Sequence, residues 1–288
     1  GAGILPCDQP PLRLLLPGLQ ATKEIMNKTP ETDTLVLILA GGRGQRLYPL
    51  TKHRTKGAIP FAGHYRLIDF ALSNCLHSGL RRICILPQYK FASLERHLQA
   101  AWSFFRPELG ESLAFLPPQQ RLDEDWYQGT ADAVYQNIYT IDSENPRSTL
   151  VLTSDHIYQM DYRPLVARHL SHGAGATIAC SGIAADDAPR YGIVEVDEND
   201  RILDLEQEPE VAERIPRAGG RAFASMGIYV FDTQALIEAL CENHEDAGST
   251  HDLGMDIIPR IVAQRQAYAF NAPACDATPG DRGFYWRD

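Results

Sequence analysis

The strongest concentration of positive charge in this chain lies between residues 34 and 68. That segment carries four arginines and two lysines and neither Asp nor Glu, although the 288-residue chain has a formal net charge of -10. Its basic residues are Arg43, Arg46, Lys52, Arg54, Lys56 and Arg66. A local positive field in an acidic protein attracts polyanions. The segment therefore predicts a site for a phosphorylated ligand.

A glycine-rich turn precedes these basic residues. Gly41, Gly42 and Gly44 allow backbone N–H groups to approach phosphate oxygens closely, because no Cβ stands in the way. No Lys-Ser or Lys-Thr follows the glycines, which excludes a Walker loop, and Leu47 stands where a dinucleotide-binding fingerprint has its third glycine. The turn predicts a phosphate loop of another kind.

Short apolar runs alternate with segments of helical periodicity in the first half of the chain. We expect strands at 35–39, 82–86 and 149–153, and helices near 65–78 and 91–101. This alternation predicts an α/β fold with a mostly parallel, twisted sheet covered by helices. Ligands bind at the carboxyl ends of such strands, where the glycine turn and Asp155 both follow a strand.

The second half reads as strands with fewer helices between them. The expected strands cover 176–181, 192–196, 202–205 and 226–231. Before them, Thr130 is expected to cap a helix whose apolar positions follow at 134, 138 and 141. The polar segment 106–129 reads as one long loop, and long loops inside compact domains are usually functional.

The composition is that of an ordinary globular domain, with 44% hydrophobic and 22% charged residues. No window approaches the roughly 18 to 20 apolar residues that span a bilayer. The six cysteines lack metal-ligand spacing, and we favour reduced, buried thiols in a cytosolic protein over disulfides or zinc. These features predict a soluble, cytoplasmic protein.

Nine stretches of the chain match motifs of a known family. They read LAGGRGQRLYPLT at 39–51, YRLIDFALSNC at 65–75, WSFF at 102–105, PQQR at 118–121, WYQGTADA at 126–133, SDHIY at 154–158, SMGIYVF at 225–231, HDLG at 251–254 and YWRD at 285–288. Together they resemble the sugar-nucleotide pyrophosphorylases, and within them the bacterial adenylyltransferase branch, the ADP-glucose pyrophosphorylases. The resemblance covers about residues 34 to 288.

This resemblance implies a domain organisation. Residues 33–288 would form a Rossmann-like nucleotidyltransferase catalytic domain, truncated at its C-terminal edge, and the family's C-terminal left-handed β-helix is absent. Residues 1–32 are expected to be a poorly ordered N-terminal extension, of which residues 1–20 have no counterpart in the family, with Met26 a candidate natural start. The full-length protein would be a homotetramer or a hetero-oligomer.

The resemblance also implies a reaction and the residues that serve it. ATP and α-D-glucose 1-phosphate would give ADP-glucose and pyrophosphate with Mg²⁺, for glycogen or starch biosynthesis, and we expect neither nucleic acid nor a membrane as a partner. The implied catalytic residues are Arg46, Lys56 and Asp155. The implied nucleotide-binding residues are Leu39, Gly41, Gly42, Gly44, Gln120, Gly129 and Asp132; the implied sugar phosphate-binding residues are Tyr127, Gly192, Gln207, Glu208 and Ser225; and the implied metal ligands are Asp155 and Asp288.

The chain departs from the family pattern at three places. Gln207 and Glu208 stand where the family has the Glu and Lys of its sugar site, so a carboxylate would face the sugar phosphate. Gly57 replaces a proline, and Ser154 replaces a glycine. Two hypotheses follow: a nucleotidyltransferase, of which a thymidylyl- or uridylyltransferase is a less favoured form, or a catalytically weak regulatory paralogue that binds nucleotide.

Overall fold

The computed structural model describes residues 29–42, 44–118, 127–184, 191–207, 221–264 and 266–272. Its strands are β1 (Thr34–Ala40), β2 (Pro60–Phe61), β3 (Tyr65–Arg66), β4 (Arg82–Pro87), β5 (Ser112–Phe115), β6 (Ser148–Thr153), β7 (Ala176–Ala184), β8 (Gly192–Val196), β9 (Ile202–Gln207), β10 (Arg221–Asp232) and β11 (Ala267–Asn271). Its α-helices are α2 (Ile68–His77), α3 (Ala92–Ala101), α4 (Thr130–Tyr135), α5 (Ile138–Glu144), α6 (Arg163–His172), α7 (Thr233–His244) and α8 (Ile258–Gln264). Short helical turns η2 (Gln45–Leu47) and η3 (Lys56–Ala58) and a π-helix, η7 (Leu253–Ile257), complete the described elements that position the site.

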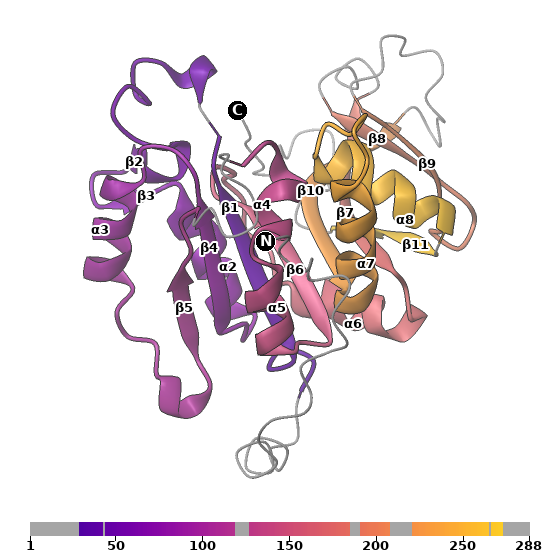
Figure 1. Cartoon of the computed structure of the whole chain (residues 1–288), viewed down its shortest axis with the longest axis horizontal. Helices are drawn as coiled ribbons and strands as arrows, with labels where there is room; N and C mark the ends of the chain where they lie inside the picture. Colours follow the sequence, from indigo (N-terminus) through magenta and orange to yellow (C-terminus); the bar gives the residue numbers. More distant parts are fainter. Residues whose placement is uncertain are drawn as a thin grey trace, which may run out of the picture.

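A mixed sheet of nine strands runs through the molecule in the order β11-β7-β10-β6-β1-β4-β5, with β8 and β9 attached beside β10. In Figure 1 it passes from β5 on the left to β11 and the β8–β9 hairpin on the right. β1 pairs in parallel with β4 and β6, and β10 is antiparallel to β6 and β7. Six of the seven strands in the main order therefore point the same way, which confirms the predicted mostly parallel sheet.

Helices cover both faces of this sheet because the buried strands are apolar on both sides. Leu35 and Leu37 of β1 pack in one core cluster with α4, α5, α7 and α8. Val36 and Ile38 pack in the other cluster, with α2, α3 and α6. A parallel strand that is buried on both faces has a continuous apolar sequence, as β1 does. It confirms the α/β class.

Several elements differ from the sequence prediction. β5 lies inside the segment predicted as one long loop, and β11, α6, α7 and α8 were not predicted. The helix predicted after Thr130 is broken into α4 and α5. Its N-cap is Gly129, which has no side chain, and the Thr130 hydroxyl bonds Asp252 and the Leu253 N–H outside the helix. The predicted capping role of Thr130 is therefore wrong.

The cysteines behave in two ways. Cys75, Cys84 and Cys180 are free and buried, and burial raises the pKa of Cys84 and of Cys180 to about 12, so these thiols stay protonated. Cys241 is disulfide-bonded, which corrects the expectation that all six thiols are reduced. Among the described residues, no helix is long and apolar enough to cross a membrane.

Candidate functional site

The glycine turn after β1 lies directly over the side chain of Lys56. Gly44 adopts a left-handed φ of 61°, and a Cβ there would stand 2.7 Å from Lys56 Cγ and 2.6 Å from Thr51 Cγ2. The Thr51 hydroxyl donates to the Gly44 carbonyl at 2.7 Å, and the Thr55 hydroxyl donates to the Ala40 carbonyl at 2.9 Å. Only glycine combines this conformation with this close approach. The turn and the segment carrying Lys56 thus form one unit.

Lys56 faces Asp155 at the carboxyl ends of β1 and β6. Lys56 Nζ lies 3.4 Å from Asp155 Oδ2, and both side chains are about one-fifth exposed, at 18% and 20%. His156 is buried, and its Nε2 lies 3.9 Å from Asp155 Oδ1. The edge therefore presents a cation and a carboxylate side by side, both accessible to a ligand. Arg46 is exposed on η2, on the same segment.

A second contact joins the same two segments beside the ion pair. A Cβ on Gly57 would stand 2.8 Å from Ser154 Oγ and 2.9 Å from Ser154 Cβ. Ser154 is buried, and its backbone N–H donates to the Leu39 carbonyl at 3.0 Å. The two departures from the family pattern at 57 and 154 therefore touch one another. The side chain of Ser154 fills the space that a side chain at position 57 would need.

Residues predicted for the sugar side gather on β8, β9 and β10. Gly192 pairs with Gln207 across the β8–β9 hairpin, and Ala224, next to Ser225, pairs with Ile193. β10 then shifts register between Ser225 and Tyr229. Within this irregularity the Ser225 hydroxyl accepts the Gly227 N–H at 3.2 Å, and a Cβ on Gly227 would stand 3.5 Å from His156 Cε1. The bulge thus brings β10 against the residue that follows Asp155.

The turn before α4 and the start of α4 carry three more of the predicted residues: Tyr127 and Gly129 in the turn, and Asp132 in the helix. Tyr127 is buried and its hydroxyl accepts from Asn137 Nδ2 at 3.0 Å; burial raises its pKa, and the bond from Asn137 lowers it less. The buried Asp132 carboxylate accepts from the Gln128 N–H at 2.8 Å. The side chains of Tyr127 and Asp132 thus stabilise the conformation of this turn. Contact of Gly129, Tyr127 and Asp132 with a ligand stays a prediction.

Gln88, which follows β4, connects this turn to the glycine loop. Its Nε2 donates to the Tyr127 carbonyl at 2.6 Å. A Cβ on Gly41 would stand 3.0 Å from Gln88 Oε1. Gln88 was not predicted as a site residue, although its place just beyond the end of a predicted strand was the available signal.

A buried carboxylate, Asp69, was also missed. It accepts from the Arg66 N–H, from Trp102 Nε1 and from His97 Nε2, each at 2.8 Å. It joins α2 to α3, and α3 packs against η3, which carries Lys56. The available signal was a carboxylate among apolar residues in the first turn of a predicted helix. Since a buried charge is costly unless it is paired, such a residue is expected to have bonding partners.

The predicted site residues Gln120, Glu208 and Asp288 lie outside the described residues, as do Arg43 and the motif positions 119, 121, 126 and 285–287. Among the described residues, no group of three or more His, Cys, Asp or Glu side chains is arranged to hold a metal ion. The edge does offer the carboxylate of Asp155. Mg²⁺ commonly takes one or two protein carboxylates and fills its remaining positions with phosphate oxygens and water, so this donor suits it.

The arrangement has the parts that phosphoryl chemistry requires. A cation and a carboxylate lie under a glycine turn, at the carboxyl edge of a parallel sheet. Backbone donors and Lys56 would neutralise phosphate charge, and no protein nucleophile is needed when the attacking group is itself a phosphate.

Comparison with known proteins agrees with this chemistry. Residues 35–288 match the family model described as nucleotidyl transferase. The chain is 43% identical to glucose-1-phosphate adenylyltransferase 2 of Vibrio vulnificus (strain CMCP6), covering 89% of this chain and 63% of the relative. It is 47% identical to glucose-1-phosphate adenylyltransferase of Nitrosococcus oceani, covering 89% and 60%, and 46% identical to that of Alteromonas mediterranea, covering 93% and 61%. The chain therefore spans less than two thirds of the length of these relatives. It belongs to the nucleotidyl transferase family.

Proposed function

We propose that this chain is the catalytic part of a glucose-1-phosphate adenylyltransferase. It would convert ATP and α-D-glucose 1-phosphate to ADP-glucose and pyrophosphate, in the cytoplasm, for glycogen or starch biosynthesis. The observation that carries the proposal is the pair of Lys56 and Asp155 under the glycine turn. The names of the relatives at 43–47% identity supply the substrates. We assign the full-length protein to a homotetramer or a hetero-oligomer on the family resemblance alone.

In this proposal the protein works by position and charge. A phosphate oxygen of the sugar phosphate attacks the α-phosphorus of ATP in line, and pyrophosphate leaves. The turn at 41–44 binds the triphosphate through backbone N–H groups, and Arg46 and Lys56 neutralise the negative charge of the leaving group. Asp155 and Asp288 are the carboxylates that would hold Mg²⁺, which supplies charge neutralisation and orientation of the phosphates when bound.

The direct test is pyrophosphate release from ATP and α-D-glucose 1-phosphate. We expect release to require both substrates and Mg²⁺, and to yield ADP-glucose. The measurement is a coupled pyrophosphate assay with the product identified by mass spectrometry, on this chain and on a version extended with the C-terminal part of a relative. Release with UTP or dTTP in preference to ATP would point to another sugar-1-phosphate nucleotidyltransferase.

A second candidate function rests on Gln207 and Glu208. Gln207 ends β9 opposite Gly192, on the side predicted to take the sugar phosphate. A catalytically weak paralogue that binds nucleotide and regulates a partner subunit would tolerate a carboxylate there. Binding of MgATP without pyrophosphate release would favour this candidate.

The substitution Glu208→Lys separates the two candidates. If the sugar phosphate lies beside this residue, reversing the charge should lower the KM for glucose 1-phosphate ten-fold or more, because a screened pair of unit charges is worth more than about 1.4 kcal/mol. The KM for ATP should change less than two-fold, and steady-state kinetics with each substrate varied measures both. Glu198→Lys, on the loop before β9, is the control for added positive charge. An unchanged KM for glucose 1-phosphate would remove the main support for the regulatory paralogue.

A further inference from the structure

The segment 249–256 lies directly against the turn that carries Gly129. A Cβ on Gly129 would stand 2.1 Å from the His251 carbonyl oxygen and 2.9 Å from that of Thr250. The Ala131 N–H donates to the same His251 carbonyl at 2.8 Å. Since backbone meets backbone here, neither side can move without the other.

Side chains make a second connection between the two segments. The Thr130 hydroxyl donates to Asp252 Oδ2 at 2.9 Å and accepts from the Leu253 N–H at 2.8 Å. The other oxygen of Asp252 accepts the N–H groups of Gly254 and Met255, at 2.8 and 3.1 Å, at the start of η7. Asp252 thus links the two segments: one carboxylate oxygen bonds Thr130 at the turn, and the other accepts backbone N–H groups at the start of η7.

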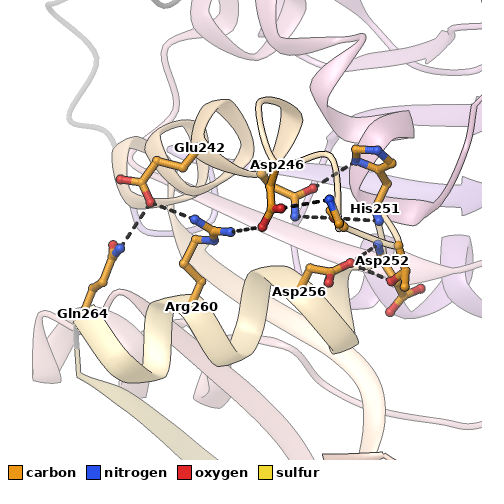
Figure 2. A network of polar contacts seen from close by, with 11 residues as sticks. Glu242, Asp246, His251, Asp252, Asp256, Arg260 and Gln264 are labelled. Atoms are coloured by element: carbon orange, nitrogen blue, oxygen red, sulfur yellow. Dashed lines mark hydrogen bonds and ion pairs between the residues drawn. The ribbon is translucent and has the colours of Figure 1, made fainter.

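Asp256 fixes the residues on both sides of His251. Its Oδ2 accepts from the Thr250 hydroxyl at 2.6 Å and from the Asp252 N–H at 2.9 Å, and Figure 2 shows it below this loop. His251 has a φ of 56°, which residues other than glycine rarely adopt. An unfavourable backbone conformation persists only where its surroundings over-determine it. The two bonds to Asp256 help to hold His251 in this conformation, because they fix the residue before it and the residue after it.

Ion pairs extend this arrangement onto α7 and α8. Arg260 of α8 lies 3.5 Å from Glu242 and 3.2 Å from Asp246, and Gln264 donates to Glu242 at 3.2 Å (Figure 2). Exposed pairs of this kind are individually weak. They connect α8, the continuation of η7, to the end of α7, but none of these contacts involves Asp256.

We propose that Asp256 is a positioning residue for the nucleotide side of the site: it holds His251 and Asp252 in the geometry that fixes the Gly129 turn. The inference rests on the proposed function, which assigns this turn to the nucleotide. The turn is connected to the phosphate loop through Gln88: its Nε2 donates to the Tyr127 carbonyl, and its Oε1 lies 3.0 Å from where a Cβ on Gly41 would stand. A displaced turn would therefore alter the surroundings of the glycine loop as well.

The protonation state of Asp256 agrees with this role. Partial burial raises the pKa of the carboxyl group, but hydrogen bonds from Thr250, Asp252 and Ser249 together bring it below the ordinary value of 3.8. A carboxylate with a lowered pKa stabilises the fold above its ordinary pKa, and this contribution is lost as the pH falls through the lowered value. The carboxylate is therefore ionised, and its bonds are intact, at neutral pH.

The test compares Asp256→Ala, Asp256→Asn and Asp246→Ala in the whole chain. Asp256→Ala should raise amide hydrogen exchange at residues 128–131 at least ten-fold, and raise the dissociation constant for MgATP five-fold or more, measured by calorimetry. Asp256→Asn keeps an oxygen acceptor and should recover most of both losses. Among the described residues, the side chain of Asp246 bonds Arg260 and the Gly248 N–H and no residue of 250–256, so Asp246→Ala should lower the melting temperature without either effect.

Each outcome decides a different point. Exchange at residues 128–131 that stays unchanged in Asp256→Ala overturns the inference, and so does faster exchange with unchanged MgATP affinity. The same losses in Asp246→Ala would reduce Asp256 to a general structural role and also overturn it. Failure of the unaltered chain to bind MgATP would count against the proposed function, while the exchange rates would still decide whether Asp256 holds the turn.

Discussion

Replacing Lys56 with alanine is expected to lower kcat/KM for ATP at least a hundred-fold. Lys56 lies under the glycine turn, where the triphosphate is proposed to bind, and its ammonium group is 3.4 Å from Asp155. Removing one preorganised donor to a developing oxyanion typically costs about 10²–10³ in rate. The loss should exceed that of a simple binding group because Asp155 also loses its neighbouring cation. Pyrophosphate release with ATP varied at saturating glucose 1-phosphate measures it.

Two further variants show whether the effect belongs to this position. Lys56→Arg keeps the charge and should recover part of the rate, although a planar guanidinium group does not reproduce a compact ammonium group. Lys52→Ala removes an exposed lysine from the same basic segment and should change kcat/KM less than two-fold. A Lys56→Ala protein within three-fold of the unaltered chain would contradict the assignment.

The elements that the sequence predicted well are those whose signal is local. β1 is a continuous apolar run that ends at glycines, and the structure places it between β4 and β6 as a strand buried on both faces. In α2, Ile68, Leu72 and Cys75 recur at helical spacing and are all buried. Periodicity and turn residues determine such elements without knowledge of distant contacts.

The elements that were missed depend on distant partners. β5 is four half-buried residues at the sheet edge, and only its pairing with β4 makes it a strand. Thr130 looked like a helix cap because threonine hydroxyls cap helices locally, but Asp252, far along the chain, is its actual partner. Two of the donors to Asp69, His97 and Trp102, lie on α3 and at its end, away from the helix that carries Asp69. A single sequence does not encode these pairings in any local pattern.

The sequence predicted the main residues of the candidate site but not the contacts that hold them in place. The glycine turn, Lys56 and Asp155 follow from strand ends and charge, and the structure brings them to one edge of the sheet. The contact of Gly57 with Ser154 could not be predicted, because the two positions are remote in sequence and each departure looked independent. Their contact indicates that the two departures are a matched pair of side-chain volumes.

This matched pair leads to the second prediction with a large effect. Gly57→Ala should destabilise the chain by about 1–3 kcal/mol, because its Cβ would meet the buried Ser154 Oγ at 2.8 Å and Cβ at 2.9 Å, and overpacking of a filled site costs that much. The strain falls on the backbone that carries Lys56 and Asp155, so pyrophosphate release should fall as well. Ser154→Gly removes the obstructing atoms, and the double variant should recover most of the stability lost in Gly57→Ala. Denaturant unfolding of the four proteins gives the coupling free energy.

A coupling free energy near zero would show that the two positions act independently. The matched control is Gly63→Ala with Ser154→Gly, because nothing lies within 4 Å of a Cβ on Gly63, so that its cost comes from its left-handed φ of 85° alone. Ser154→Gly should not relieve that cost. A rescue confined to Gly57→Ala would therefore locate the coupling at the contact between the two segments that carry Lys56 and Asp155.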